Sequence, residues 1–456
     1  MAKRTMGAGR KLPSPLGWGR GRRPVWGLCC LLGVLAWLPA VARAQSNVNT
    51  GTSMNPVGSG ARAMGQGNAF IAVADDATAA SWNPAGLSQL ERPEISLAVE
   101  YLTSRGTISS SGHPETEDVS RMDVADLNYF SVAYPFHPGR NVVLSLNYLK
   151  LYRFERELAF PVQWGATTDA MYIDARYEVE QTGSLSALAP AIGIDVTDRL
   201  SLGLTLNLWS DDLTQSSSFT RTETEDGVFH VMGSNPYSLV TENRFEVESG
   251  YSVVLGALYR LTKQWTLGAV VKPGFALDLD HTYSNWFEGS YAPATLIEAE
   301  SDAELEMPLI VGAGVAWRPS DPLTVSFDAT WTQWSEFNLY EHGTDWNPLT
   351  NRTEDAGRCE DATTCRLGAE YLLVYPRYIV PLRCGVGYDP GPAIDQVDAF
   401  YTASVGTGLQ VGRFAFDIGY EMRWGDGVNG SIYPAEWESS EDVLQHRVLA
   451  SMIVYF

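Results

Sequence analysis

The chain has 456 residues, 45% of them hydrophobic, and its formal net charge at pH 7 is −22. This acidic balance argues against binding to nucleic acid, which requires a basic surface. Beyond residue 44, no apolar run is long enough to cross a membrane as a helix.

Residues 1–44 predict an export signal. A stretch rich in Lys and Arg precedes an apolar core, Val25 to Leu38, which is too short for a permanent transmembrane helix. The sequence Ala42-Arg43-Ala44 fits a cleavage site before Gln45. We therefore expect the mature protein to lie outside the cytoplasm.

Residues 45–93 show no alternating pattern, although a run of glycines between Gly58 and Gly67 permits close packing. Later in this stretch comes Asn83-Pro84-Ala85-Gly86. Asn followed by Pro, with Gly two residues further on, is typical of a turn or a helix stop. This turn explains the motif without any functional role.

Residues 94–456 contain fourteen segments with the period of a β-strand. The clearest are Leu200 to Leu208, Leu323 to Trp331 and Phe414 to Trp424, in which apolar residues alternate with small or polar ones. An apolar outer face and a polar inner face are typical of a membrane barrel. The chain ends on such a strand with Phe456, a signal for the barrel assembly machinery.

The connectors between these segments alternate between short and long. The short ones are Pro135–Arg140, Val196–Arg199, Leu261–Gln264, Arg318–Pro322, Val374–Arg377 and Gly412–Arg413. The long ones are Arg105–Ala125, Phe154–Ile173, Asp212–Glu242, Ser284–Ser301, Ser335–Thr363, Asp389–Phe400 and Gly425–Leu444. This alternation predicts an all-β fold, a 14-stranded antiparallel transmembrane barrel in the outer membrane.

Fourteen strands enclose more space than the wall side chains can fill, because about eight strands already suffice for that. Either the lumen is an open pore or residues 45–93 plug it. We predict three parts: a signal peptide at 1–44, an N-terminal plug at 45–93 and the barrel at 94–456.

Several stretches resemble the FadL/TodX family of outer-membrane long-chain fatty acid and hydrocarbon transporters. They are Gly67-Asn68-Ala69-Phe70, Ala74-Asp75-Asp76-Ala77-Thr78, Trp82-Asn83-Pro84-Ala85-Gly86-Leu87, Asp328 to Phe337 and Leu382 to Pro390. Their order and spacing match over essentially the whole mature chain.

The resemblance implies a monomeric barrel with an N-terminal hatch inside, in which Asn83, Pro84, Ala85 and Gly86 would serve gating. Substrate would be captured by outer loops, pass the hatch and leave sideways into the membrane lipid. In the family the side opening comes from a kinked third strand. Here Asn141 to Arg153 contains neither Gly nor Pro, so we expect the fourth strand to be the weaker one.

The substrate implied is a hydrophobic small molecule, foremost a long-chain fatty acid, carried through the outer membrane of a Gram-negative bacterium. Two alternatives stay open: a surface shuttle that binds secreted proteins, and a channel for aromatic hydrocarbons. We expect no enzyme, because G-x-S-x-G and H-E-x-x-H are both absent. No catalytic residue, cofactor or metal site is expected.

Two predicted outer loops carry apolar residues, which are costly in water unless they pack together or hold a ligand. They are Phe229, Val231, Met232 and Tyr237 in the third long connector and Trp286, Phe287 and Tyr291 in the fourth. Two explanations for these residues stay open: they pack on each other, or they form a groove that captures a ligand. As ligand contacts we select Phe229, Met232, Trp286, Phe287 and Tyr291.

Strand alternation predicts that four arginines point into the lumen: Arg366, Arg383, Arg423 and Arg447. Arg383 and Arg423 are candidates for binding a carboxylate head group. Acidic residues of the same strands face the same space, so an internal ion-pair network is the alternative.

Cys359 and Cys365 lie in a long connector, and the oxidising cell envelope permits a disulfide between them.

Overall fold

The computed structural model describes residues 58–110, 116–136, 140–165, 171–231, 233–290, 293–349, 352–353, 357–394, 397–429 and 439–456. The predicted export signal, Met232 and Tyr291 lie outside these residues. Among the residues described, no helix is long and apolar enough to cross a membrane.

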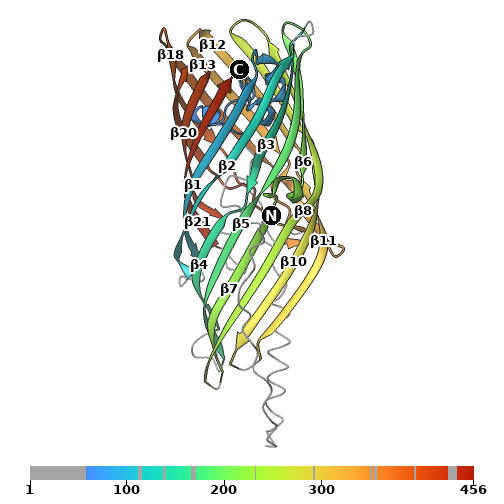
Figure 1. The fold of residues 1–456 in the computed structure, drawn as a ribbon. Helices are drawn as coiled ribbons and strands as arrows, with labels where there is room; N and C mark the ends of the chain where they lie inside the picture. The colour runs from blue at the N-terminus through green and yellow to red at the C-terminus, as the bar shows by residue number, and fades with distance from the viewer. Residues whose placement is uncertain are drawn as a thin grey trace, which may run out of the picture. The chain divides into compact units, whose positions relative to one another are not determined.

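The structure is a closed antiparallel barrel with a wall of fourteen strands (Figure 1), which confirms the predicted fold. The strands of the first half of the chain are β1 (Glu94–Ser110), β2 (Asp118–Phe136), β3 (Val142–Arg153), β4 (Arg156–Trp164), β5 (Tyr172–Asp195), β6 (Leu200–Trp209), β7 (Ser218–His230) and β8 (Ser234–Arg260). Those of the second half are β9 (Trp265–Lys272), β10 (Phe275–Gly289), β11 (Thr295–Met307), β12 (Ile310–Ser320), β13 (Leu323–Thr332), β14 (Asn338–Glu341), β15 (Thr344–Asn347), β16 (Arg352–Thr353), β17 (Ala362–Val374), β18 (Tyr378–Tyr388), β19 (Tyr401–Val411), β20 (Phe414–Asn429) and β21 (Ser439–Tyr455).

Several wall strands consist of two pieces, because the chain bends or loses its ladder part of the way along. The pairs are β3 with β4, β6 with β7, β9 with β10, β11 with β12, and β13 with β14. The first and last strands close the barrel: β1 pairs with β21 from Glu94 opposite Tyr455 to Ser110 opposite Ser439.

Three of the predicted long loops are wrong, because they consist largely of strands. Phe154–Ile173 contains β4, Asp212–Glu242 contains β7 and the first part of β8, and Ser284–Ser301 contains the end of β10 and the beginning of β11. Together with the first half of β5 these strands form a continuous sheet beyond the rest of the wall, the outer extension, seen at the lower end of Figure 1. The backbone N–H and C=O groups of this extension form hydrogen bonds with neighbouring strands, so these residues adopt strands rather than loops.

The third wall strand is interrupted. β3 pairs with β2 only from Leu149 opposite Tyr129 to Val142 opposite Phe136. After Phe154 and Glu155, β4 has a ladder with β5 and, among the described residues, with no other strand. β5, by contrast, is unbroken, so the interruption lies in the third strand and not in the fourth, where we expected the weakness.

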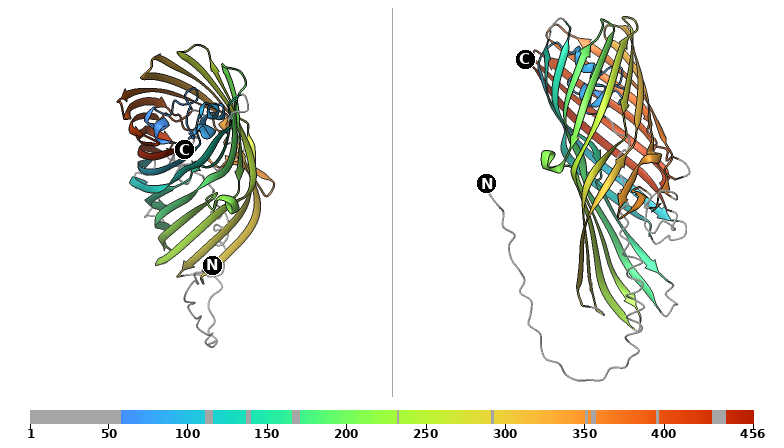
Figure 2. Two further views of the ribbon diagram at one scale, coloured as in Figure 1. Left: turned by 45° about the horizontal axis from the view of Figure 1, so that its top comes forward. Right: turned by 90° about the vertical axis from the view of Figure 1, so that its right-hand side faces the viewer.

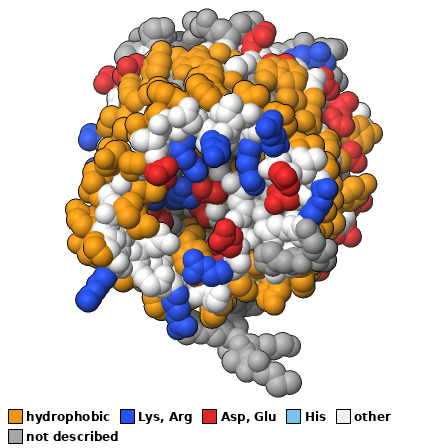
Figure 3. Space-filling model, turned by 90° about the horizontal axis from the view of Figure 1, so that it is seen from above, with side chains coloured by type: hydrophobic (Ala, Val, Ile, Leu, Met, Phe, Trp, Pro, Cys, Tyr) orange, Lys and Arg blue, Asp and Glu red, His pale blue; other side chains and the backbone are white. Residues whose placement is uncertain are grey.

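The outer surface of the wall is apolar, as the alternation predicted. Phe416 and Ile418 of β20 are 44% and 49% exposed, whereas Glu421 of the same strand is buried. Aromatic pairs line both rims, with Trp265 stacked on Trp317 at one and Tyr401 beside Trp424 at the other. Such belts mark the two membrane interfaces. In Figure 3 the hydrophobic side chains surround a hollowed centre in which charged groups gather.

The N-terminal segment, residues 58–90, lies inside the wall, as Figure 2 shows from one end. It consists of α2 (Ala61–Gly65), α3 (Ala79–Trp82) and the 3-10 helix η1 (Pro84–Gln89), joined by tight turns. α2 lies against β18 to β21, and η1 lies against β3, β5, β6 and β8. Almost every residue in it is buried.

Candidate functional site

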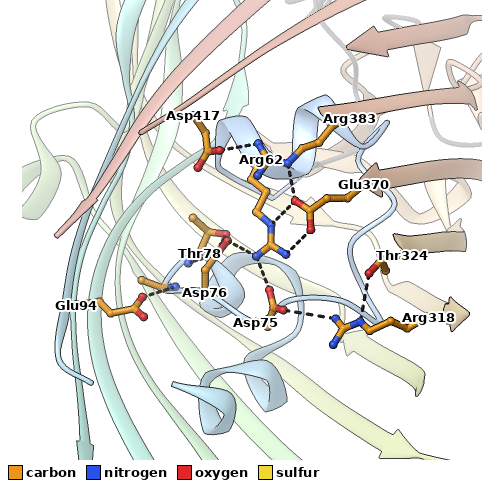
Figure 4. Close-up of polar contacts among 11 residues, drawn as sticks. Arg62, Asp75, Asp76, Thr78, Glu94, Arg318, Thr324, Glu370, Arg383 and Asp417 are labelled. Atoms are coloured by element: carbon orange, nitrogen blue, oxygen red, sulfur yellow. Dashed lines mark hydrogen bonds and ion pairs between the residues drawn. The ribbon is translucent and has the colours of Figure 1, made fainter. Parts of the chain in front are cut away.

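One side of the lumen, formed by β17 to β21 and β1, carries an ion-pair network. Arg383 on β18 donates to Glu370 on β17 (2.7 Å) and to Asp417 on β20 (2.6 Å). Glu370 also accepts two hydrogen bonds from Arg62 of the N-terminal segment, at 3.0 and 3.2 Å. Figure 4 shows how this carboxylate joins the segment to the wall.

Arg62 is the centre of the network. Besides Glu370 it contacts Asp75 at 2.5 Å and Asp76 at 3.5 Å, both within its own segment. Burial alone would lower the pKa of Arg62, but these carboxylates outweigh burial and hold it well above its usual range. The guanidinium is therefore a permanent positive charge inside the barrel.

Asp76 is a carboxyl group of this network whose charged form is disfavoured by burial. Burial raises its pKa above the ordinary value, although Arg62 and hydrogen bonds from Thr78 (2.6 and 2.9 Å) act in the opposite direction. Nearby, Glu94 of β1 accepts a hydrogen bond from the amide of Ala77 (3.1 Å).

The four arginines predicted to face the lumen all do so, and each is ion-paired. Arg423 donates to Asp389 (3.0 Å) and stacks on Phe400 (3.6 Å), and Arg366 reaches the same aspartate at 3.4 Å. Arg447 donates to Glu100 at 2.7 Å. The geometry is that of the ion-pair network, and carboxylate binding by Arg383 and Arg423 stays a prediction.

The opposite side of the lumen, formed by β3 to β11 and β14, carries a large apolar cluster beside a few buried ion pairs such as that of His281 with Glu341. Phe219 lies 4.8 Å from Phe154 and 4.8 Å from Phe245, measured between ring centroids. Beside them Trp209 stacks on Phe275 at 5.6 Å. With other buried side chains these rings form one large apolar cluster, which includes Tyr152, Leu277, Leu305, Met307, Trp334 and Phe337.

Lys272, the last residue of β9, is a cation that sequence reasoning missed. Its side chain lies on the same face as the buried Gly268 and Val270, so it points into the lumen. Among the residues that the structure describes it forms no ion pair, and the guanidinium of Arg366 repels it. The two-residue alternation along β9 would have predicted that this side chain points inward.

Lys272 lies at a boundary. Before it, Val270 packs with Val254 and with Ile71 of the N-terminal segment. After it, beyond Pro273 and Gly274, Phe275 packs on the large apolar cluster. An anionic group placed here would have an apolar wall on one side and the N-terminal segment below it.

The predicted gating residues form a rigid turn. Asn83 donates to the carbonyls of Ile71 (2.9 Å) and Ala257 (3.0 Å), and its side-chain oxygen accepts from Ala85 (3.2 Å). A Cβ at Gly86 would lie 1.7 Å from the Ala74 carbonyl oxygen. These contacts give the motif a structural role, and gating stays a prediction.

Three of the predicted capture residues, Phe229, Trp286 and Phe287, lie on strands of the outer extension. Tyr237 of β8 stacks near Phe287 of β10 at 6.4 Å, and Phe229 lies on β7. Trp286 neighbours Phe287 in the strand and so faces the other side of the sheet, where it is 39% exposed. The structure therefore does not bring Trp286 and Phe287 onto one surface.

The predicted disulfide is not present, because Cys359 and Cys365 are both free. Cys359 is buried in the apolar cluster, and its thiol lies 3.8 Å from the Asn347 side-chain oxygen. Cys365 is held in β17 opposite Ala329. Among the described residues, no group of three or more His, Cys, Asp or Glu could hold a metal ion.

The family model described as outer membrane protein transport protein (OMPP1/FadL/TodX) matches residues 40–426. The fold is similar to the crystal structure of a Pseudomonas aeruginosa FadL homologue, with a TM-score of 0.60 at 15% identity over 89% of this chain and 99% of that chain. The Pseudomonas putida toluene transporter TodX gives 0.54 at 13% identity, over 88% and 98%. The CymD monoaromatic hydrocarbon channel gives 0.52 at 17%, also over 88% and 98%. No curated protein matches in sequence.

At such low identities the solved structures show the fold alone, whereas the family match covers most of the chain. Members of this family are outer-membrane β-barrel proteins of Gram-negative bacteria that act as channels and transporters of hydrophobic molecules. The chain therefore belongs to the OMPP1/FadL/TodX family of outer membrane transport proteins.

Proposed function

We propose that the protein carries hydrophobic molecules with an acidic head group, foremost long-chain fatty acids, through the outer membrane. The observation that carries this proposal is Lys272, an inward ammonium group that lies at the edge of a large apolar cluster and forms no ion pair with any residue the structure describes. A carboxylate on Lys272 would form a charge-assisted hydrogen bond. Its hydrocarbon chain would lie along the rings of the cluster.

The route begins at the outer extension, where apolar residues such as Phe287 would capture the substrate. The substrate then follows the apolar side of the lumen to Lys272. It leaves sideways into the membrane lipid after a rearrangement of the N-terminal hatch. The interruption between β2 and β4 favours the third strand for this exit, because backbone hydrogen bonds do not close the wall there.

The remaining parts of the proposal concern maturation. The export signal is removed near Ala44, residues 45–93 form the plug, and the barrel assembly machinery inserts the chain as a monomer.

Asn83 to Gly86 would take part in gating, and Arg383 and Arg423 would meet a carboxylate only if one of their ion pairs opened.

A channel for aromatic hydrocarbons is the second candidate. The packed rings of Phe154, Phe219 and Phe245 favour it, since they offer faces and edges to an uncharged aromatic molecule. TodX and CymD, both similar in fold, are described as a toluene transporter and a monoaromatic hydrocarbon channel. A surface shuttle for secreted proteins remains the third.

The test is saturable binding of labelled oleate and of oleyl alcohol to the purified barrel in mild detergent. We expect Lys272→Met to weaken oleate binding about tenfold, roughly 1.4 kcal/mol, and to leave the alcohol unaffected. Lys263→Met, in the exposed turn between β8 and β9, is the matched control and should bind as the wild type does.

Equal oleate affinity in the Lys272→Met barrel would contradict the head-group role. Saturable toluene binding without oleate binding would favour the hydrocarbon channel, and no binding of either would favour the shuttle.

A further inference from the structure

Among the described residues, nine wall glycines lie directly against backbone atoms of the N-terminal segment. Each is on a different strand, and they are Gly193, Gly203, Gly256, Gly268, Gly314, Gly368, Gly385, Gly406 and Gly419. Gly312 also lies against the segment, but the only part of it that Gly312 meets is the Ile71 side chain. Several are ladder partners: Gly193 pairs with Gly203, Gly203 with Gly256, and Gly406 with Gly419. We name this set the glycine ring.

The contacts of the glycine ring are closer than a side chain would allow. A Cβ at Gly203 would lie 2.1 Å from the Pro84 carbonyl carbon, and one at Gly385 would lie 2.3 Å from the Gly67 nitrogen. Real Cβ atoms do not approach backbone atoms at such distances. The backbone of the N-terminal segment therefore lies directly on the backbone of the wall.

Backbone conformation does not explain these glycines. The glycines with positive φ are Gly60, Gly67, Gly165, Gly183, Gly233, Gly343, Gly412 and Gly427, and none belongs to the glycine ring. An alanine could adopt the backbone angles of every ring position. The close approach of the segment is the reason that remains.

Hydrogen bonds hold the segment at the level of the glycine ring. The amide of Ile71 donates to Asp328 (2.7 Å), and that of Gly67 donates to the Ser404 hydroxyl (2.9 Å). Asn68 donates to Glu421 at 2.7 Å. Both ends of the segment are thus fixed to the wall, one by α2 and its turn and the other by Asn83 and η1.

Four neighbouring strands, β21, β1, β2 and β3, contribute no such glycine, and the segment touches β1 and β2 through longer side chains. β13 contributes none either, but its Asp328 accepts the hydrogen bond from the Ile71 amide. The Tyr129 hydroxyl donates to the Ala77 carbonyl (2.6 Å), and Glu94 accepts from the Ala77 amide. Residues 74–82 of the segment face these strands beside the interruption of the third wall strand. They also reach β6, where the Thr205 hydroxyl donates to the Ala80 carbonyl (2.9 Å).

We propose that the glycine ring determines what the barrel excludes. It makes the N-terminal segment a fixed seal against water and dissolved ions, and only residues 74–82 yield while a substrate passes. The seal itself is independent of the substrate. The yielding of residues 74–82 rests on the proposed sideways release.

The seal is tested by conductance in planar bilayers. Gly203→Ala and Gly385→Ala should conduct ions where the wild type does not, because the added methyl groups displace the segment from the wall. Gly387→Ala on β18 is the matched control, since its Cβ would meet the Thr402 side chain and not the segment. Folded ring variants that remain as impermeable as the control would overturn the proposal.

Hydrogen exchange on the wild-type barrel tests whether only residues 74–82 yield, and it does not require that the variants fold. With oleate bound, amides of Ala61–Ile71 and Asn83–Leu90 should stay protected while those of residues 74–82 exchange faster. Loss of protection along the whole segment at once would refute the fixed seal. Failure of the fatty acid proposal would show separately, as absent oleate binding by a barrel that is still impermeable.

Discussion

The two sides of the lumen wall are built by the same strand alternation but hold the N-terminal segment differently. On the side of β17 to β21, inward arginines and carboxylates bind the segment through Arg62 and Asn68. On the side of β3 to β11, rings and aliphatic side chains pack above it, while close contact with wall glycines occurs on both sides. Charge pairs define one position, whereas an apolar surface accepts molecules of many shapes, so the first side suits anchoring and the second suits transport.

Removal of Arg62 should have the largest effect on stability. Arg62→Ala leaves the buried Asp76 without a cation and removes one of the two cations of Asp75 and of Glu370, and breaking a buried pair in this way costs about 4 kcal/mol. The unfolding free energy in detergent and urea measures it. Arg318→Ala is the control, because Arg318 lies 3.9 Å from Asp75 with a half-exposed side chain; its loss should cost under about 1 kcal/mol. Equal losses in both variants would contradict the anchoring role.

Phe245→Ala tests the apolar side. Phe245 is 1% exposed and stacks on Phe219, so we expect a loss of roughly 3 kcal/mol from the cavity and the missing contacts. Oleate and oleyl alcohol should both bind more weakly, because the ring would line the path of either tail. Unchanged binding of both ligands in a folded variant would remove this side from the route.

Asp76 should make stability depend on pH. Since its pKa is raised in the folded protein, the folded state binds this proton more tightly than the unfolded chain does. The stabilisation is present below the unfolded pKa, about 4, and is lost as pH rises through the folded pKa. Asp76→Asn should therefore flatten the fall of the unfolding free energy from pH 4 towards neutrality. A fall of the same size in both proteins would point to another group.

We expect the smallest effect on the barrel from treatment with a reducing agent. Because Cys359 and Cys365 are free, dithiothreitol should change neither gel mobility nor unfolding. Burial raises the pKa of the Cys359 thiol to about 12, so maleimide at pH 8 should label it only after denaturation. A mobility shift on reduction, or rapid labelling of the folded barrel, would place Cys359 outside the apolar side.

The alternation of the wall could be predicted because lipid and lumen impose opposite polarities on successive residues, as Phe416 and Asp417 illustrate. The inward direction of Arg383 and Arg423 followed from the same counting. Residues 218–230 were mistaken for a loop because β7 has few apolar residues: its stability comes from ladders with β5 and β8, which depend on distant chain segments.

Contacts of the N-terminal segment could not be predicted for a related reason. A wall glycine such as Gly385 has no side chain whose character reveals its partner, and Gly67 reaches it only in the folded barrel. Lys272 was missed because it directly precedes Pro273, where the regular strand pattern stops. The disulfide prediction was wrong because nearness in sequence does not determine the direction of two side chains.

The long ladder between β1 and β21 restricts the order of folding. The backbone of residues 58–90 lies on wall glycines of nine strands. We therefore expect this segment to be laid on the sheet while the sheet is still open, with the pairing of Glu94 and Tyr455 as the last step of assembly. The pairing of β21 with β1 would thus lock in place a segment that precedes every strand of the wall.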